Sequence, residues 1–172
     1  MRARFDAEKA IEAILYIAKR VENPTFHSIS KILYFADQIH IVKYGCFITG
    51  DEYVAMKHGP VPSNTYDILK FVRGDRENCR ADHARALMSV RHKYYIAIQR
   101  DADLDEFSDS DLECLDESIS ENGCLSFEEL TKKSHDKIYD AAGQDEFIPA
   151  EAFAVLASNP TILKEHINNP AN

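Results

Sequence analysis

Three residues in the stretch 31–63 have side chains suited to acid–base chemistry: Asp37, His40 and His58. Asp37 and His40 are three positions apart in a helical pattern and so share a helix face, and His58 follows across an expected hairpin. A carboxylate that orients an imidazole is the arrangement used in general-base catalysis. A buried acid and histidine can equally fasten a hairpin onto a helix. The second interpretation is favoured, because no Ser or Cys nucleophile nearby has an activating motif, and the sequence lacks HExxH, DxD and Gly-rich phosphate motifs.

The segment KHGPVPS is a candidate contact edge for another protein. Its first two residues present cations, and its Gly-Pro-Val-Pro core forms a stiff apolar ridge that loses little entropy when it is immobilised in an interface. With the preceding methionine, the candidate residues are Met56, Lys57, His58, Gly59, Pro60, Val61, Pro62 and Ser63. The alternative is that the prolines only steer the chain from a strand into a helix. Both roles are compatible.

Tyrosines gather in and around the same stretch. A tyrosine combines a large ring with a hydrogen-bonding hydroxyl, so it serves equally well in a half-buried core or at an interface. The tyrosines concerned are Tyr34, Tyr44, Tyr53, Tyr66, Tyr94 and Tyr95. Tyr34 and Tyr53 join Asp37 and His40 in the candidate binding set.

Helices are expected to position most of these residues. Apolar side chains recur every three or four positions in three N-terminal segments, which is typical of helices with one buried face. The expected helices run from an Asp6 cap to about Arg20, from a Thr25 cap to about Lys43 before Gly45, and from a Ser63 cap to about Arg73 before Gly74.

The C-terminal third also predicts helices. A hydroxyl followed three positions later by a carboxylate is the capping-box pattern, and proline favours the first helical turn. The pairs Ser108 with Asp111 and Ser126 with Glu129 predict helices over 109–121 and 127–135, Pro149 predicts one to about Ser158, and Pro160 a short last one.

Two regions read as extended. Residues 46–56, CFITGDEYVAM, predict a hairpin that turns at 49–51, and 90–99, VRHKYYIAIQ, predict a third strand beside it. The expected fold class is therefore α+β, mainly α: a helical domain with a small antiparallel β-sheet made of a hairpin plus one strand. A chain of this length supports one core, so we expect one domain over 1–172 with C-terminal helices over 108–168.

Composition limits the kinds of partner and ligand that are expected. The chain has 29 acidic and 20 basic residues and a net charge of −9, which repels nucleic acid and anionic lipid and favours a basic protein partner. The cysteines, Cys46, Cys79, Cys114 and Cys124, lack zinc-site spacing and are expected to be reduced thiols. We expect no metal or cofactor. Without an apolar leader or a long apolar run, the expected location is the cytoplasm, with no membrane contact.

The stretches KILYFADQIHIVKYG and ITGDEYVAMKHGPVPS, followed by TYDILK, closely resemble the SocA-like, or Panacea, antitoxin domain. The signature of that family runs K-L-L-Y-F-A-D and then Y-G-x-x-I-T-G-D-x-Y-V-A-M-x-x-G-P-V-P-S. The resemblance is strong over 10–73 and looser over 126–136. It implies that the shared residues serve the fold, the contact with a toxin, or both.

The resemblance implies an antitoxin of a bacterial type II toxin–antitoxin system, which binds a cognate toxin encoded beside it and catalyses no reaction. Some members deliver the toxin to a protease, and others are phage or mobile-element proteins. Two alternatives therefore stay open: a proteolytic adaptor, and a hydrolase or nuclease that uses Asp37, His40 and His58. Many members carry a DNA-binding segment before the domain. Here the first helix begins within ten residues, so no autonomous DNA binding is expected. The surface around the signature is expected to choose the partner.

Overall fold

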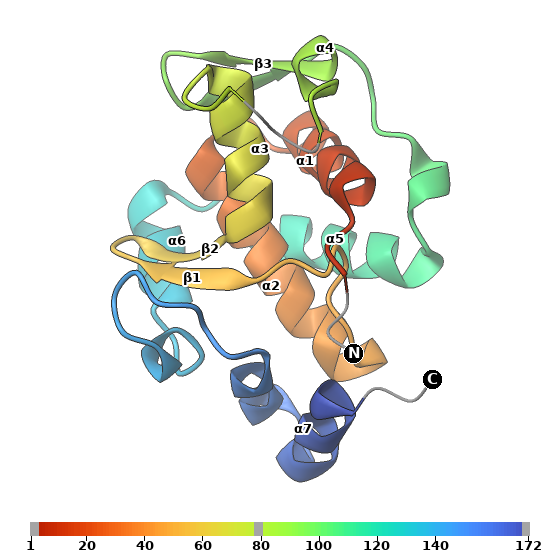
Figure 1. The fold of residues 1–172 in the computed structure, drawn as a ribbon, viewed down its shortest axis with the longest axis vertical. Coiled ribbons are helices and arrows are strands. Elements are labelled where there is room, and N and C mark those ends of the chain that lie inside the picture. The colour runs from red at the N-terminus through yellow and green to blue at the C-terminus, as the bar shows by residue number, and fades with distance from the viewer. Residues whose placement is uncertain (1–3, 78–80, 170–172) are drawn as a thin grey trace.

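The computed structural model describes residues 4–77 and 81–169, and the helix α2 (Phe26–Tyr44) runs through its centre (Figure 1). The other helical segments are α1 (Ala7–Arg20), α3 (Ser63–Arg73), α4 (Ala84–Leu87), η1 (Leu104–Glu106), α5 (Asp109–Asn122), α6 (Phe127–Ser134), η2 (Tyr139–Ala141), η3 (Ala150–Leu156) and α7 (Pro160–Asn168), where η denotes a 3-10 helix. The strands are β1 (Tyr53–Met56), β2 (Gly59–Pro62), β3 (Met88–Arg91) and β4 (Tyr95–Ile98). The expected mainly helical α+β class is confirmed.

Two hydrophobic clusters share α2. Ile29 and Ile32 on one face pack into a cluster with Ile14 of α1 and with residues of α3 and α5. On another face, Tyr34 packs into a second cluster that includes Phe153 of η3. In Figure 1 α1, α3 and β3 lie toward one end of the molecule and α7 lies toward the other, with α2 between them. Burial on both sides explains why α2 is apolar around so wide an arc.

The predicted helix caps at four N-termini are confirmed. The Asp6 side chain accepts a hydrogen bond from the Lys9 backbone N–H, and Thr25 forms a capping box with Ser28. The other two are the capping boxes of Ser108 with Asp111 and Ser126 with Glu129. Gly45 and Gly74 end α2 and α3 in left-handed conformations, as expected.

The predicted Ser63 cap of α3 is wrong, because Ser63 is the first helical residue and its side chain makes no capping hydrogen bond. The cap comes from Asp51, whose carboxylate accepts from the backbone N–H groups of Asn64 and Thr65 at 2.9 and 2.8 Å. It also accepts from the Thr65 hydroxyl at 2.7 Å. A buried carboxylate at this helix end supplies the acceptors, and the negative charge, that the first turn requires.

The predicted position of the first hairpin is also wrong. Strand β1 pairs with β2, and the turn falls at Lys57 and His58 and not at 49–51. Residues before β1 are tied to helices instead: the Ile48 N–H donates to Asp37 at 2.7 Å, and the Thr49 carbonyl accepts from the Asp6 N–H at 2.9 Å. These bonds take up the backbone groups that a strand would need.

Residues 90–99 do not form one strand, and they do not join the first hairpin. The chain turns at His92 and Lys93, both with positive φ (48° and 72°), so that β3 pairs with β4 as a separate sheet. The outer edge of β4 pairs with the segment before α2, where the Ile96 N–H donates to the Pro24 carbonyl at 2.8 Å. This pairing places the β3–β4 turn beside the start of α2.

Both edges of the β1–β2 hairpin are covered or blunted. Residues 145–148 pair with β1: the Ala55 N–H donates to the Glu146 carbonyl, and the Ile148 N–H to the Tyr53 carbonyl. Since Tyr53 and Ala55 bond outward there, their partners Pro62 and Pro60 face outward on β2. Prolines have no N–H, so the outer edge of β2 offers no donor at these positions.

The segment after Pro149 differs from the prediction in type. It forms the 3-10 helix Ala150–Leu156, and not an α-helix to Ser158. Phe153 and Ala154 bury this short helix in the second cluster. The short helix predicted at Pro160 is confirmed as α7, capped by Asn159.

Candidate functional site

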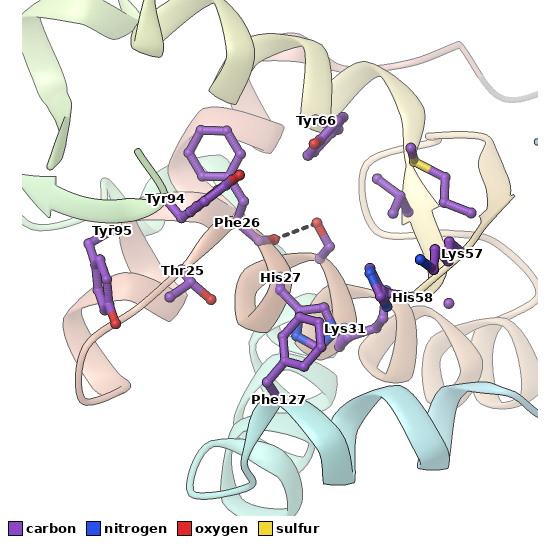
Figure 2. Close-up of a pocket in the computed structure, with 14 residues that line it drawn as sticks. Thr25, Phe26, His27, Lys31, Lys57, His58, Tyr66, Tyr94, Tyr95 and Phe127 are labelled. Atoms are coloured by element: carbon purple, nitrogen blue, oxygen red, sulfur yellow. Dashed lines mark hydrogen bonds between the residues drawn. The ribbon is translucent and has the colours of Figure 1, made fainter. Parts of the chain in front are cut away.

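A groove of about 530 Å³ opens between the turns of the two hairpins. Figure 2 shows Tyr94 and Tyr95 on one side, Lys57 and His58 on the other, and Phe127 of α6 below them. We call it the aromatic groove. It is lined by Thr25, Phe26, His27, Ser30, Lys31, Met56, Lys57, His58, Gly59, Val61, Tyr66, Tyr94, Tyr95 and Phe127. The lining contains five aromatic residues besides two histidines, two lysines and no Asp or Glu.

The β1–β2 turn supplies one wall of the groove. Lys57 and His58 are exposed at its tip, and Gly59 follows with φ +103°. A Cβ at position 59 would lie 2.8 Å from Cε of Lys31 and would also overlap the Ser134 hydroxyl of α6. The glycine therefore lets the strand pass closely between α2 and α6, which a larger residue would prevent.

The β3–β4 turn supplies the opposite wall. Tyr94 and Tyr95 are 53% and 42% exposed, so large ring areas face solvent. Their backbone is fixed, because the Tyr94 carbonyl accepts from the Phe26 N–H at 3.0 Å and Arg73 of α3 donates to the Lys93 carbonyl at 3.0 Å. The walls of the groove are thus held by hydrogen bonds to α2 and α3.

Phe127 forms the lower part of the groove and stacks between two histidines. Its ring centroid lies 4.0 Å from that of His27 and 5.2 Å from that of His58. The His27 Nε2 also lies 3.0 Å from the Thr131 hydroxyl. Burial, and then the nearby charge of Lys31, lower the pKa of His27 to about 4, so its ring is neutral at physiological pH.

Lys31 lies at the floor of the groove and is 1% exposed. Its Nζ donates to the Pro60 carbonyl at 2.8 Å. Within residues 4–77 and 81–169 it makes no ion pair with a carboxylate. Burial lowers the pKa of Lys31 to about 7, because the ammonium is removed from water without a counter-charge.

Asp37 and His40 do not form a catalytic pair with His58. The Asp37 carboxylate is fully buried and accepts from the Ile48 N–H at 2.7 Å and from the Tyr53 hydroxyl at 2.6 Å. Burial raises the pKa of Asp37 to about 7. Neither Asp37 nor His40 lines the aromatic groove, whereas His58 does. The three residues are therefore not brought together, and the first two fasten the chain after α2 onto that helix.

His40 belongs to a separate buried network. Its Nδ1 lies 2.7 Å from the Cys46 carbonyl, and its Nε2 is 3.2 Å from a carboxylate oxygen of Asp111 on α5. Burial disfavours the imidazolium, but Asp111 and Cys46 outweigh it and raise the pKa of His40 to about 10. Lys9 of α1 donates to the same carboxylate at 3.0 Å. This cluster joins three helices and does not open into the groove.

Tyr34 connects the signature helix to the segment after α6. Its hydroxyl donates to the Asp136 carboxylate at 2.9 Å, and Gln38 donates to the same group at 2.8 Å. Asp136 in turn accepts from the backbone N–H groups of Ile138 and Tyr139. Tyr34 is fully buried, so its hydroxyl has a structural role.

The candidate residues from the sequence therefore divide into two sets. The buried set holds the fold: Tyr34, Asp37, His40, Tyr53, Gly59, Pro60 and Pro62. The half-buried and exposed set comprises Met56, Lys57, His58, Val61 and Ser63, and all of these except Ser63 line the groove, as does the buried Gly59. The sequence interpretation missed His27, Lys31 and Phe127 as groove residues. A lysine flanked by buried apolar positions in α2 was the available signal for Lys31.

Over 4–77 and 81–169, no group of three or more His, Cys, Asp or Glu is placed to hold a metal ion. Cys46, Cys114 and Cys124 are free thiols, and Cys79 lies outside the described residues. None of the described helices is long and apolar enough to cross a membrane.

Comparison with known proteins gave one match. The family model described as antitoxin SocA-like, Panacea domain, matches residues 29–138. This range contains most of α2, both hairpins, α5 and α6, and therefore most of the groove. No curated protein and no solved structure matched the chain. The match spans well over half of the sequence and agrees with the signature, so the chain belongs to the SocA-like Panacea antitoxin domain family.

Proposed function

We propose that this protein is the antitoxin of a type II toxin–antitoxin system, and that it neutralises a cognate toxin by binding it directly through the aromatic groove. In this proposal the chain acts as one domain in the cytoplasm, and its partner is a protein encoded by an adjacent gene. The observation that carries the proposal is the gathering of exposed aromatic rings from separate elements at one groove inside the family-matched region.

Exposed rings of this kind are the usual anchors of protein interfaces. Tyr94, Tyr95 and Phe127 are each 42–53% exposed, and they come from the β3–β4 hairpin and from α6. Aromatic side chains contribute large contact areas at little entropic cost, and they dominate binding energy when a partner covers them. Contiguous apolar surface is expensive to leave in water unless a partner uses it.

The surrounding groups support binding over catalysis. Asp37 and His40 use their polar atoms within the scaffold and lie outside the groove lining. The groove contains a lysine and a histidine at its rim, Lys57 and His58, on a turn whose backbone is fixed by Gly59 and Pro60. Such a rigid rim presents side chains without an ordering cost on binding.

Co-expression tests the proposal. The product of the adjacent gene should be toxic when expressed alone, should copurify with this chain, and should lose its toxicity in its presence. An unchanged amount of toxin in the rescued cells distinguishes blocking from delivery to a protease. If no neighbouring product binds or is toxic, the proposal fails.

A groove variant tests the contact surface. Tyr94→Ala combined with Phe127→Ala should weaken toxin binding at least about tenfold, because truncating an aromatic anchor removes more than ~1.4 kcal/mol. Leu104→Ala combined with Ile162→Ala is the matched control, since those side chains are 51% and 62% exposed and do not line the groove. If both variants lose toxin affinity equally, or if neither loses it, the groove is not part of the interface.

The rim can be tested separately by charge reversal. Lys57→Glu with His58→Glu should weaken neutralisation while the unfolding midpoint stays unchanged, because both side chains are exposed. Full rescue by this double variant contradicts a contact at the rim.

A further inference from the structure

The charge of the groove is opposite to that of the molecule around it. The chain carries a net charge of −9. Yet the groove lining has no Asp or Glu, and its lysines are Lys31 at the floor and Lys57 at the rim. A partner group that enters the groove therefore meets lysines and ring faces, although the net charge of the molecule is negative.

Lys31 is the group within the groove that most needs a partner. Its ammonium has three N–H donors, and the Pro60 carbonyl accepts one of them. It is 1% exposed, and no carboxylate of the described residues pairs with it. A buried charge without a counter-charge is unfavourable, and an arriving anion would correct this.

We propose that, within the antitoxin–toxin complex proposed above, the groove takes an acidic segment of the toxin: an Asp or Glu carboxylate pairs with Lys31, and a neighbouring apolar or aromatic side chain packs between Tyr94 and Phe127. The inference rests on the proposed function. The volume of about 530 Å³ accommodates a few side chains of an extended segment. Pro60 and Pro62 offer no N–H donor to a strand added beside β2, so recognition falls mainly on side chains.

A protein carboxylate fits the groove better than a nucleic-acid phosphate. A polyanion must approach a surface whose net charge repels it along its whole length. A single acidic side chain on a basic protein is attracted by that same surface and then pairs locally with Lys31. The cation and the rings would also suit a free nucleotide, and a competition with AMP distinguishes the two.

Pairing with a carboxylate has a proton signature. In the free protein the pKa of Lys31 is about 7 because of burial. A bound carboxylate favours the charged form and raises that pKa, so binding takes up protons above pH 7 and weakens as the pH rises further. The other titratable lining groups are His27 on α2, Lys57 and His58 on the β1–β2 turn, and the tyrosines Tyr66, Tyr94 and Tyr95, while α6 contributes the non-titrating Phe127.

The test uses the full chain and the toxin with which it copurifies. The dissociation constant should rise about tenfold or more between pH 7 and pH 9, and calorimetry in two buffers of different ionisation enthalpy at pH 8 should show proton uptake. Lys31→Met should bind at least about tenfold more weakly at pH 7 and lose this pH dependence. Lys57→Met is the matched control, because it removes an exposed groove ammonium and should keep the pH dependence.

The outcomes distinguish failure of the proposed function, which is toxin binding, from failure of the proposed carboxylate pairing with Lys31. Absence of any toxin binding defeats the proposed function itself. Binding that is independent of pH from 7 to 9, with no proton uptake, overturns the carboxylate pairing alone, and this measurement needs no variant to fold. On the toxin, one Asp→Asn or Glu→Gln substitution should abolish the pH dependence. Displacement of the toxin by millimolar AMP from the unmodified chain, and not from Lys31→Met, would assign the groove to nucleotides instead.

Discussion

The Asp51 carboxylate holds the first turn of α3 through Thr65, accepting from its backbone N–H at 2.8 Å and from its hydroxyl at 2.7 Å. The two residues are fourteen positions apart, and both are buried. The helix that starts after the signature prolines is thus capped by an acidic residue that comes before the hairpin. The hairpin is closed at its base by this contact.

Removing that carboxylate should destabilise the fold. Asp51→Ala leaves the Asn64 and Thr65 N–H groups without their acceptor, and we expect a loss of about 3 kcal/mol in the free energy of unfolding. Ser63→Ala is the control, because the Ser63 side chain caps nothing, and it should change stability by less than about 0.5 kcal/mol. Urea unfolding measures both. A larger loss for Ser63→Ala would contradict the capping assignment.

Alanine variants of two glycines with nearly equal φ distinguish the stability lost through backbone strain from the stability lost through steric overlap. Gly59 (φ +103°) has Lys31 and Ser134 where a Cβ would lie, whereas Gly74 (φ +100°) has no atom within 4 Å of that position. We expect Gly74→Ala to lower stability by about 1–2 kcal/mol through strain alone. Gly59→Ala adds an overlap worth about 2 kcal/mol more. Equal losses in thermal unfolding would mean that the strand does not approach α2 and α6 closely.

The His40 network predicts a loss of stability in alkali. Asp111 and Cys46, opposed by burial, raise the pKa of His40 to about 10, above its ordinary value of 6.5. The folded state therefore binds the extra proton between these values, so this contribution is complete below pH 6.5 and is lost as the pH rises to 10. At 1.36 kcal/mol per pKa unit, its upper limit is about 5 kcal/mol. In a Lys31→Met background, His40→Gln should abolish this fall, as measured by chemical unfolding at a series of pH values.

The lowered pKa of Lys31 predicts that stability rises with pH, opposite to the effect of His40, over an overlapping pH range. Its pKa of about 7 lies below the ordinary value of 10.5, so the unfolded chain binds more protons between these values and stability rises with pH there. In the unmodified protein the two contributions oppose each other from pH 7 to pH 10. Lys31→Met should expose the fall due to His40, and His40→Gln should expose the rise due to Lys31. If both variants keep the profile of the unmodified protein, neither pKa assignment holds.

Helix limits were predictable because their causes are local. Each capping pair, such as Ser126 with Glu129, lies within four residues, and glycines with positive φ mark the ends of α2 and α3. The signature stretch was less predictable because its polar residues bond across long distances. Asp37 reaches Ile48 and Tyr53, so residues that look like a turn and a strand are bound to a helix instead.

The strand errors share a cause. The sequence predicts a turn at 49–51 because Gly50 favours one, but the hairpin turns occur at Lys57–His58 and at His92–Lys93, where no glycine or asparagine occupies the turn itself. His92 and Lys93 accept left-handed conformations because pairing of β4 with the segment before α2 holds the turn. Tertiary contacts, and not local propensity, thus set the positions of these turns.

The groove could be predicted only in part. The Lys57–His58 rim follows from the signature and the ridge of prolines. The other walls come from Tyr94, Phe127 and the start of α2, and only the packing of the hairpins and α6 against α2 brings these together. For Lys31 the sequence offers only its place among apolar neighbours in α2, which indicates burial but not that the side chain lies at the floor of a groove.

The covered and blunted edges of the β1–β2 hairpin distinguish a backbone that the fold constrains from turn side chains that can be substituted. Residues 145–148 cover the outer edge of β1, and the outward-facing prolines leave no N–H donor at positions 60 and 62 of β2. The turn residues Lys57, His58, Tyr94 and Tyr95, by contrast, have exposed side chains that line the groove. Substitutions at these exposed positions should affect the stability of the fold less than substitutions in the buried strands. On the proposed function, changes in toxin preference should therefore be concentrated at these two turns.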